Sequence, residues 1–116
     1  MLTKLQALKE CKTLWMWLEK NPDRYKREWP GWKGNHAYIS LCPCCEYAKD
    51  LNTWSGVDCR QCPLNDFAWS GLIGQRCMGS SSPFRQWLNT LDYSEKSAAA
   101  HKMVLACRRA IYKETK

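Results

Sequence analysis

Residues 41–77 read LCPCCEYAKDLNTWSGVDCRQCPLNDFAWSGLIGQRC and hold six of the eight cysteines of the chain. Cys42 and Cys45 form one C-x-x-C unit, and Cys59 and Cys62 form a second unit after thirteen intervening residues. Two residues between thiolates allow one tight turn to aim both sulfurs at a common point, and two such turns complete a tetrahedral Zn²⁺ site. We therefore predict one structural zinc ion held by these four cysteines.

Other residues compete for a place in this zinc site. Cys77 is the main alternative ligand, and His36, six residues before Cys42, is a weaker one. Cys44 shares a turn with Cys42 and Cys45, so we expect its side chain to point away from the metal and to be exposed.

A disulfide framework is the alternative interpretation of an even number of cysteines in a small domain. Lys4, Lys9, Glu10, Lys12 and Glu19 interrupt the apolar positions of the first twenty residues, which leaves no uncharged stretch of a secretion signal. No apolar run approaches the ~18 residues of a membrane span. Thiols stay reduced in the cytosol, so we expect metal ligands in a cytoplasmic protein that does not associate with membranes.

The formal net charge of +7 belongs to the two ends of the chain. Residues 1–33 carry eight Lys and Arg against four acids, and residues 81–116 carry seven against three. The middle carries three cations against four acids, and four thiolates on one Zn²⁺ would make it more acidic. Any surface for an acidic partner is therefore expected in the terminal segments.

Residues 23–34 interleave four cations with three aromatic rings, as in surfaces that bind phosphates and stack bases. The alternative, which we favour for the tryptophans, is that they pack on the first helix and fill a thin core. The residues that we expect to bind nucleic acid or another partner are Arg24, Lys26, Arg27, Trp32, Arg108 and Arg109.

Local signals predict helices on both sides of the cysteines. Thr3 and Gln6 form a capping box before a helix whose apolar positions run from Leu5 to Leu18. The pair Asn21-Pro22 ends that helix and is expected to begin a short second one. Ser82-Pro83 predicts the start of a helix over residues 84–91.

The last helix is expected to begin with Ser94 as its cap and to bury Ala100, Met103 or Val104, Cys107 and Ile111. Between the helical ends we expect a strand over residues 36–41 and a helical turn over residues 46–51. The sequence thus predicts one mainly α, zinc-stabilised domain with little or no sheet. Its parts are a helical segment 1–34, a zinc-binding middle 35–80 and C-terminal helices 81–116.

Five motifs follow one another over most of the chain: W-x-W-L-x-x-N-P (15–22), W-P-G-W (29–32), C-P-x-C-E-Y-A (42–48), C-x-x-C-P-L (59–64) and C-x5-P-F-x-x-W (77–87). Together they resemble a group of small, cysteine-rich proteins of tailed bacteriophages. The resemblance implies a phage-encoded protein that works in the bacterial cytoplasm, and it implies no reaction. The matching cysteines would be Cys42, Cys45, Cys59, Cys62 and Cys77, while Cys44 replaces a usual apolar residue.

Catalytic patterns are incomplete in this sequence. A zinc deaminase needs H-x-E before its cysteines, whereas residues 36–38 read H-A-Y. The chain has only two histidines, and Cys44 beside His36 is the best candidate for a Cys-dependent enzyme. We expect a non-enzymatic protein without a small-molecule substrate. Its partner is expected to be nucleic acid, or alternatively a host protein that it binds and modulates.

Overall fold

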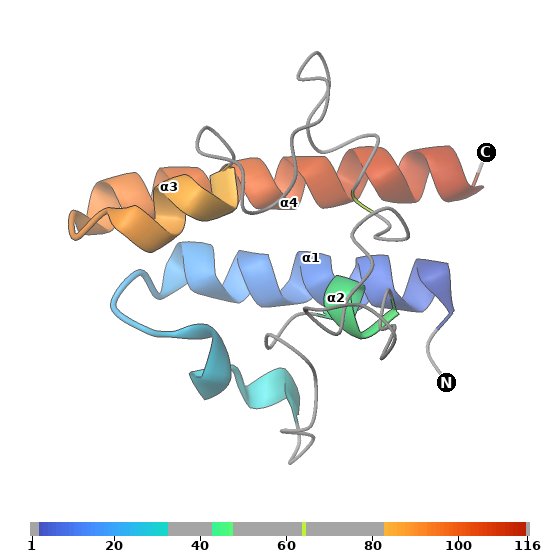
Figure 1. The fold of residues 1–116 in the computed structure, drawn as a ribbon, viewed down its shortest axis with the longest axis horizontal. Coiled ribbons are helices and arrows are strands. Elements are labelled where there is room, and N and C mark those ends of the chain that lie inside the picture. Colours follow the sequence, from blue (N-terminus) through green and yellow to red (C-terminus); the bar gives the residue numbers. More distant parts are fainter. Residues whose placement is uncertain (1–2, 33–42, 48–63, 65–82, 116) are drawn as a thin grey trace, which may run out of the picture.

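The computed structural model describes residues 3–32, 43–47, 64 and 83–115, and these residues are mainly helical (Figure 1). The α-helices are α1 (Lys4–Lys20), α2 (Pro43–Tyr47), α3 (Pro83–Asn89) and α4 (Tyr93–Thr115), with 3-10 helices η1 (Lys26–Glu28) and η2 (Pro30–Trp32) after α1. No strand occurs among the described residues. The expected strand at 36–41 and most of the predicted zinc-binding middle lie outside them.

Helix α1 begins and ends where the sequence predicted. Thr3 Oγ1 accepts a hydrogen bond from the amide of Gln6 at 3.1 Å, and Gln6 Oε1 accepts one from the amide of Thr3 at 2.9 Å. This reciprocal capping box satisfies two donors that the first turn leaves without a helical partner. Asn21 closes the last turn, with its amide donating to Leu18 O at 3.3 Å. The expectation of an α-helix starting at Pro22 is wrong, because a turn follows and then only η1.

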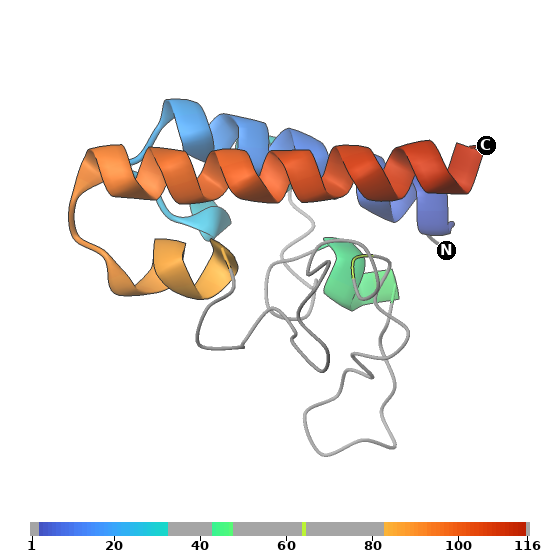
Figure 2. The ribbon, with the colours of Figure 1, turned by 90° about the horizontal axis from the view of Figure 1, so that it is seen from above.

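Helices α1 and α4 run antiparallel and form the centre of the fold (Figure 2). Lys4 of α1 lies 3.3 Å from Glu114 of α4, and Ser97 Oγ donates to Glu19 O at 2.7 Å near the other end. The predicted apolar faces are confirmed except at Leu5 and Ile111, which are only half-buried. The buried residues share one side of each helix: Ala7, Leu8, Cys11, Leu14, Trp15 and Leu18 on α1, and Ala99, Ala100, Met103, Val104, Ala106, Cys107 and Ala110 on α4. Burial of these faces drives their association.

The start of α4 is capped by Asp92 and not by Ser94. Asp92 Oδ1 accepts hydrogen bonds from the amides of Ser94 and Glu95 at 2.8 and 3.1 Å, and from Ser94 Oγ at 2.7 Å. The Ser94 hydroxyl and these two amides hold the pKa of Asp92 below its usual value. The expectation of a Ser94 cap is therefore wrong by two residues, because Ser94 itself donates to the preceding carboxylate.

Helix α3 begins at Pro83, as predicted, but ends at Asn89, before Leu91. Phe84 and Trp87 pack against Trp15 of α1, with ring centroids 6.0 and 5.2 Å away and nearly perpendicular planes. Lys96 of α4 lies 4.4 Å above the Trp87 ring and donates to Trp87 O at 2.8 Å. Desolvation in this position lowers the pKa of Lys96. Lys96 therefore links α4 to α3 through a cation–π contact and a hydrogen bond.

The tryptophans after α1 belong to the core. Trp29 and Trp32 are 8% and 2% exposed, and their rings contact edge to face at 4.9 Å. Trp32 Nε1 donates to Lys26 O at 2.7 Å. A side chain at Gly31 would collide with the Trp29 ring, so glycine permits this close approach. The packing alternative is confirmed, and the expectation that Trp32 is an exposed partner-binding ring is wrong.

Helix α2 packs its first residues against α1. Pro43 and Cys44 are fully buried, and Cys44 Sγ lies 3.9 Å from Ala7 O. The expectation of an exposed Cys44 is therefore wrong. The helix ends at Tyr47, and the rest of the helical turn predicted over 46–51 lies outside the described residues.

Candidate nucleic-acid interface

The predicted zinc ligands are almost all outside the part of the chain that the structure describes. These residues are Cys42, Cys59, Cys62, Cys77 and the alternative ligand His36. Cys45 lies in α2, where only its backbone is described. Within the described residues, no three His, Cys, Asp or Glu side chains gather in a way that could hold a metal ion. The zinc site therefore stays a prediction.

Two described residues next to the C-x-x-C units share one hydrophobic core. Cys44 lies inside the first unit, and Leu64 follows the second unit after Pro63. Both side chains are 0% exposed and belong to the cluster that α1 and α4 build. The chain beside each unit is therefore anchored in the same core.

The structure places the predicted cations of the N-terminal segment in different environments. Arg24 lies 3.7 Å from Asp23 and 3.5 Å from Glu28, so neighbouring acids offset its charge. Lys26 is half-buried, with Nζ 4.6 Å above the Phe84 ring, while Arg27 is exposed. Arg24 and Lys26 thus have internal partners, which weakens the expectation that this segment is the main binding surface.

Arg108 and Arg109 both lie on the solvent side of α4. Lys102 and Lys113 are exposed on the same helix, and no Asp or Glu occurs between His101 and Lys113. Glu114, the next acid along α4, forms an ion pair with Lys4, with Oε2 3.3 Å from Nζ. Arg108 and Arg109 therefore lie on a stretch of α4 that carries no acid of its own.

Helix α1 adds three cations that the sequence argument did not select. Lys9 and Lys20 are exposed, away from the apolar face of α1, and Lys12 is half-buried. Of the two acids in this helix, Glu19 contacts His101, and Glu10 has one carboxylate oxygen buried. The helical period that identified the apolar face would also have identified Lys9 and Lys20 on the opposite side and Lys12 at the edge of that face.

We call this surface the α1–α4 basic face, and its members are Lys9, Lys12, Lys20, Arg108 and Arg109. Figure 2 shows α1 and α4 along one side of the molecule, with α2 and α3 on the other side. The face therefore lies on the two longest helices.

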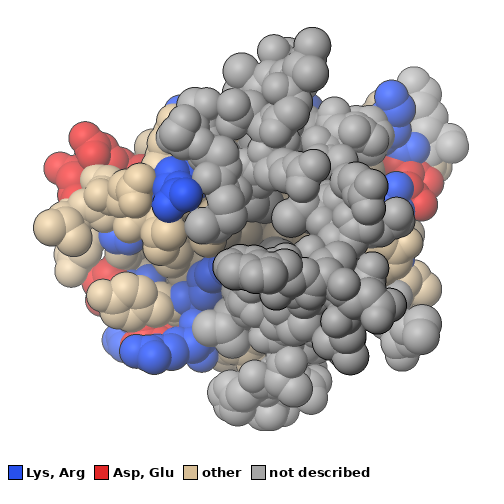
Figure 3. All heavy atoms as spheres, viewed as in Figure 1, with Lys and Arg blue, Asp and Glu red and all other residues tan. Residues whose placement is uncertain are grey.

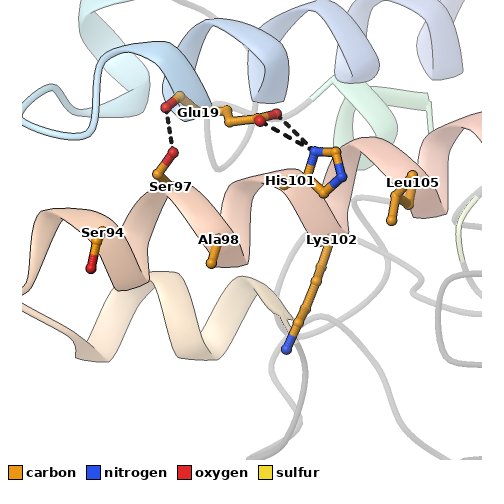
Figure 4. Close-up of a pocket in the computed structure, with 7 residues that line it drawn as sticks. All are labelled: Glu19, Ser94, Ser97, Ala98, His101, Lys102 and Leu105. Atoms are coloured by element: carbon orange, nitrogen blue, oxygen red, sulfur yellow. Dashed lines mark hydrogen bonds and ion pairs between the residues drawn. The ribbon is translucent and has the colours of Figure 1, made fainter.

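A shallow open groove of about 730 Å³ lies on the first half of α4, where Glu19 at the end of α1 also lines it (Figure 4). His101 Nδ1 lies 3.2 Å from the Glu19 carboxylate, and Ser97 lies one turn before His101 on the same helix. These three residue types also build catalytic triads, in which the serine donates its proton to the histidine. Here Ser97 Oγ donates to the main-chain oxygen of Glu19 at 2.7 Å, so the geometry is that of a helix–helix contact and not of an activated nucleophile.

Among the described residues, no helix is both long and apolar enough to cross a bilayer. No protein-family model, curated protein or solved structure matches this chain. The resemblance to phage proteins therefore remains an expectation.

Proposed function

We propose that this chain is a zinc-stabilised, non-enzymatic protein that binds nucleic acid through its basic helices. The observation that carries the proposal is the α1–α4 basic face. Its five cations are Lys9, Lys12, Lys20, Arg108 and Arg109. The acid at the groove, Glu19, is in contact with His101. Phosphate backbones bind such surfaces because each neutralised phosphate releases counterions.

The two C-x-x-C units are proposed to hold the structural zinc ion. Four thiolates at this spacing form a closed structural site, and such a site adds apparent binding energy of ~10–16 kcal/mol to folding. The anchoring of Cys44 and Leu64 in one core supports it, because residues next to both units are held against the same helices. The resemblance to phage proteins adds the setting, which is a bacterial cytoplasm during infection.

Fluorescence anisotropy tests nucleic-acid binding directly. The full-length protein is titrated into labelled 20-nucleotide DNA and RNA, single- and double-stranded, at 50 and 200 mM salt. We expect binding at the lower concentration and a steep loss at the higher one, since each phosphate contact contributes about 0.9 to the log–log slope with duplex DNA. Absence of binding to all four probes at both concentrations would refute the proposal.

A host-protein effector is the second candidate, and the α3–α4 corner is the observation that favours it. Leu88, Leu91 and Tyr93 are 47%, 93% and 58% exposed, beside the acidic Asp92 and Glu95. Figure 3 shows acidic side chains gathered at this end of the molecule. The acids would repel phosphate, whereas the exposed apolar side chains suit contact with another protein.

The two candidates differ in which substitution matters. A complex with a host protein would survive nuclease treatment and would be lost in Leu91→Ser, whereas nucleic-acid binding would not change in this variant. Arg108→Gln with Arg109→Gln should have the opposite effect, weakening nucleic-acid binding and leaving a protein complex intact.

A further inference from the structure

We infer that Lys9, Lys12, Arg108 and Arg109 form one row across α1 and α4, and that this row binds the phosphates of both strands of a duplex without reading base sequence. The inference rests on the proposed function and names its ligand class. It follows from the register of the two helices, which brings together residues about 100 positions apart in the chain.

The contacts at the two ends of the helix pair determine this register. Lys4 meets Glu114 at one end, and Glu19 meets Ser97 and His101 near the other. Both helices rise ~1.5 Å per residue, so equal numbers of residues cover equal lengths. Counting inward from both ends places Lys9 and Lys12 at the level of residues 106–109 of α4.

The order across the face follows from the helical period. Lys12 lies seven residues, or about two turns, before Glu19, and Arg108 lies seven residues after His101. Since Glu19 and His101 contact each other across the helix pair, Lys12 and Arg108 come next, two turns further along, on the same facing edges of α1 and α4. Lys9 and Arg109 lie further out on α1 and α4. The row therefore reads Lys9, Lys12, Arg108, Arg109 from one edge of the helix pair to the other.

The width of this row fits the backbone of a duplex and not the interior of a groove. Packed helices have axes about 8–10 Å apart and diameters of ~10–12 Å, so the pair is roughly 20 Å wide. The major groove of B-DNA is ~12 Å wide and admits one helix. Two helices side by side must instead rest on the backbones that border a groove, where contacts carry no direct sequence information.

Single strands are a poorer match, because proteins bind them by stacking bases on exposed aromatic rings. Of the described tryptophans, Trp15, Trp29, Trp32 and Trp87 are at most 8% exposed, and Trp17 is half-buried. On the second half of α4 the exposed ring in the described residues is Tyr112, one turn beyond Arg108 and 65% exposed. One ring beside four cations favours phosphate contacts over a stacking platform.

The test compares two variants with the same change of net charge. The row variant carries Lys9→Gln, Lys12→Gln, Arg108→Gln and Arg109→Gln. The control carries four glutamines at cations outside the α1–α4 basic face, at positions Arg24, Arg27, Arg85 and Lys102. A third variant is Tyr112→Ala. Each full-length protein is first compared with wild type by circular dichroism and thermal unfolding, so that only folded proteins enter the binding assay.

Binding is then measured against 20-bp DNA duplexes of three unrelated sequences and against a 20-nucleotide single strand, from 50 to 200 mM salt. Four duplex contacts predict a log–log slope near 3.6, which is a roughly 150-fold loss of affinity over this fourfold rise in salt. We expect the row variant to lose most of that slope and the control to keep it. We also expect equal affinity for the three duplexes, weaker binding of the single strand, and little effect of Tyr112→Ala.

Equal losses in the row variant and the control would overturn the inference, because they would show an effect of net charge alone. Tighter binding of the single strand, lost in Tyr112→Ala, would also overturn it while leaving the proposed function intact. If wild type binds no probe, the proposed function itself fails.

Discussion

Replacement of Cys44 by serine is the substitution for which structure and sequence predict opposite results. The sequence predicts little effect, because Cys44 was expected to be exposed beside the metal ligands. In the structure the Cys44 side chain is 0% exposed and its sulfur lies 3.9 Å from Ala7 O. This distance suits a weak contact of a thiol, whereas a hydroxyl needs an acceptor at about 2.5–3.0 Å. Serine has the shorter side chain, so its hydroxyl would be buried without a well-placed acceptor at Ala7.

The expected cost follows from that geometry. Burying a hydroxyl whose hydrogen bonds are poorly placed costs about 1–3 kcal/mol in protein mutants, and we take about 2 kcal/mol. An unfolding entropy of about 2.1 cal/mol/K per residue gives roughly 0.24 kcal/mol/K for 116 residues. The Tm of Cys44→Ser should therefore be lower by roughly 8 °C.

Thermal unfolding followed by circular dichroism, in reducing buffer, measures this difference. Ala98→Ser is the matched control, because it adds a hydroxyl at an exposed position of α4 and should change Tm by only a few degrees. The zinc content of folded Cys44→Ser should equal that of wild type. A Tm within 2 °C of wild type would refute the reasoning, and loss of zinc from the folded variant would mean that Cys44 is a ligand.

Three further predictions concern the metal, the core and pH. Elemental analysis of protein purified without added zinc should find one Zn²⁺ per chain, lost in Cys59→Ser; a ratio near zero with intact disulfides by mass spectrometry would contradict the site. Val104→Ala should lower the free energy of unfolding by about 1.5–3 kcal/mol and more than Ile111→Ala, because Val104 is 2% exposed and Ile111 only partly buried; equal, negligible losses would contradict this packing. Because the pKa of Asp92 is lowered in the folded protein, its charge stabilises α4 above about pH 5, and this contribution is lost as the pH falls through the folded pKa, below 3.8. The Tm difference between wild type and Asp92→Asn should therefore shrink from pH 5 to acidic pH, and a constant difference would exclude the effect.

Features that depend on a few neighbouring residues could be predicted from the sequence. The capping box of Thr3 and Gln6, the end of α1 at Asn21 and the start of α3 at Pro83 all follow from hydrogen bonds or fixed dihedral angles within four residues. The buried faces of α1 and α4 follow from the helical period. The misplaced cap of α4 belongs to the same class, since Asp92 and Ser94 are both good caps and the sequence alone does not rank them.

Features that depend on distant parts of the chain could not be predicted. The sequence shows Trp32 next to cations, but only the fold brings its indole to Lys26 O and buries it. The cation row is a second example. Lys9 and Arg109 become neighbours through the register of α1 against α4, which no local pattern encodes. From the sequence we therefore expected Arg24 and Lys26 to bind as well as Arg108 and Arg109, and the structure shows the first two charges beside Glu28 and Phe84.

The pairing of the first helix with the last one also has a consequence for how the protein is made. Residues 21–92 separate α1 from α4, and translation at ~5–20 residues per second needs roughly 4–14 s to produce them. During this interval the apolar face of α1 lacks its longest partner, α4, although α2 and the cysteines in the middle have already been synthesised. A nascent chain would therefore depend on chaperones or early metal capture to avoid aggregation. Once α4 leaves the ribosome, contacts between residues so far apart in the sequence would make closure of the core the slow step of folding.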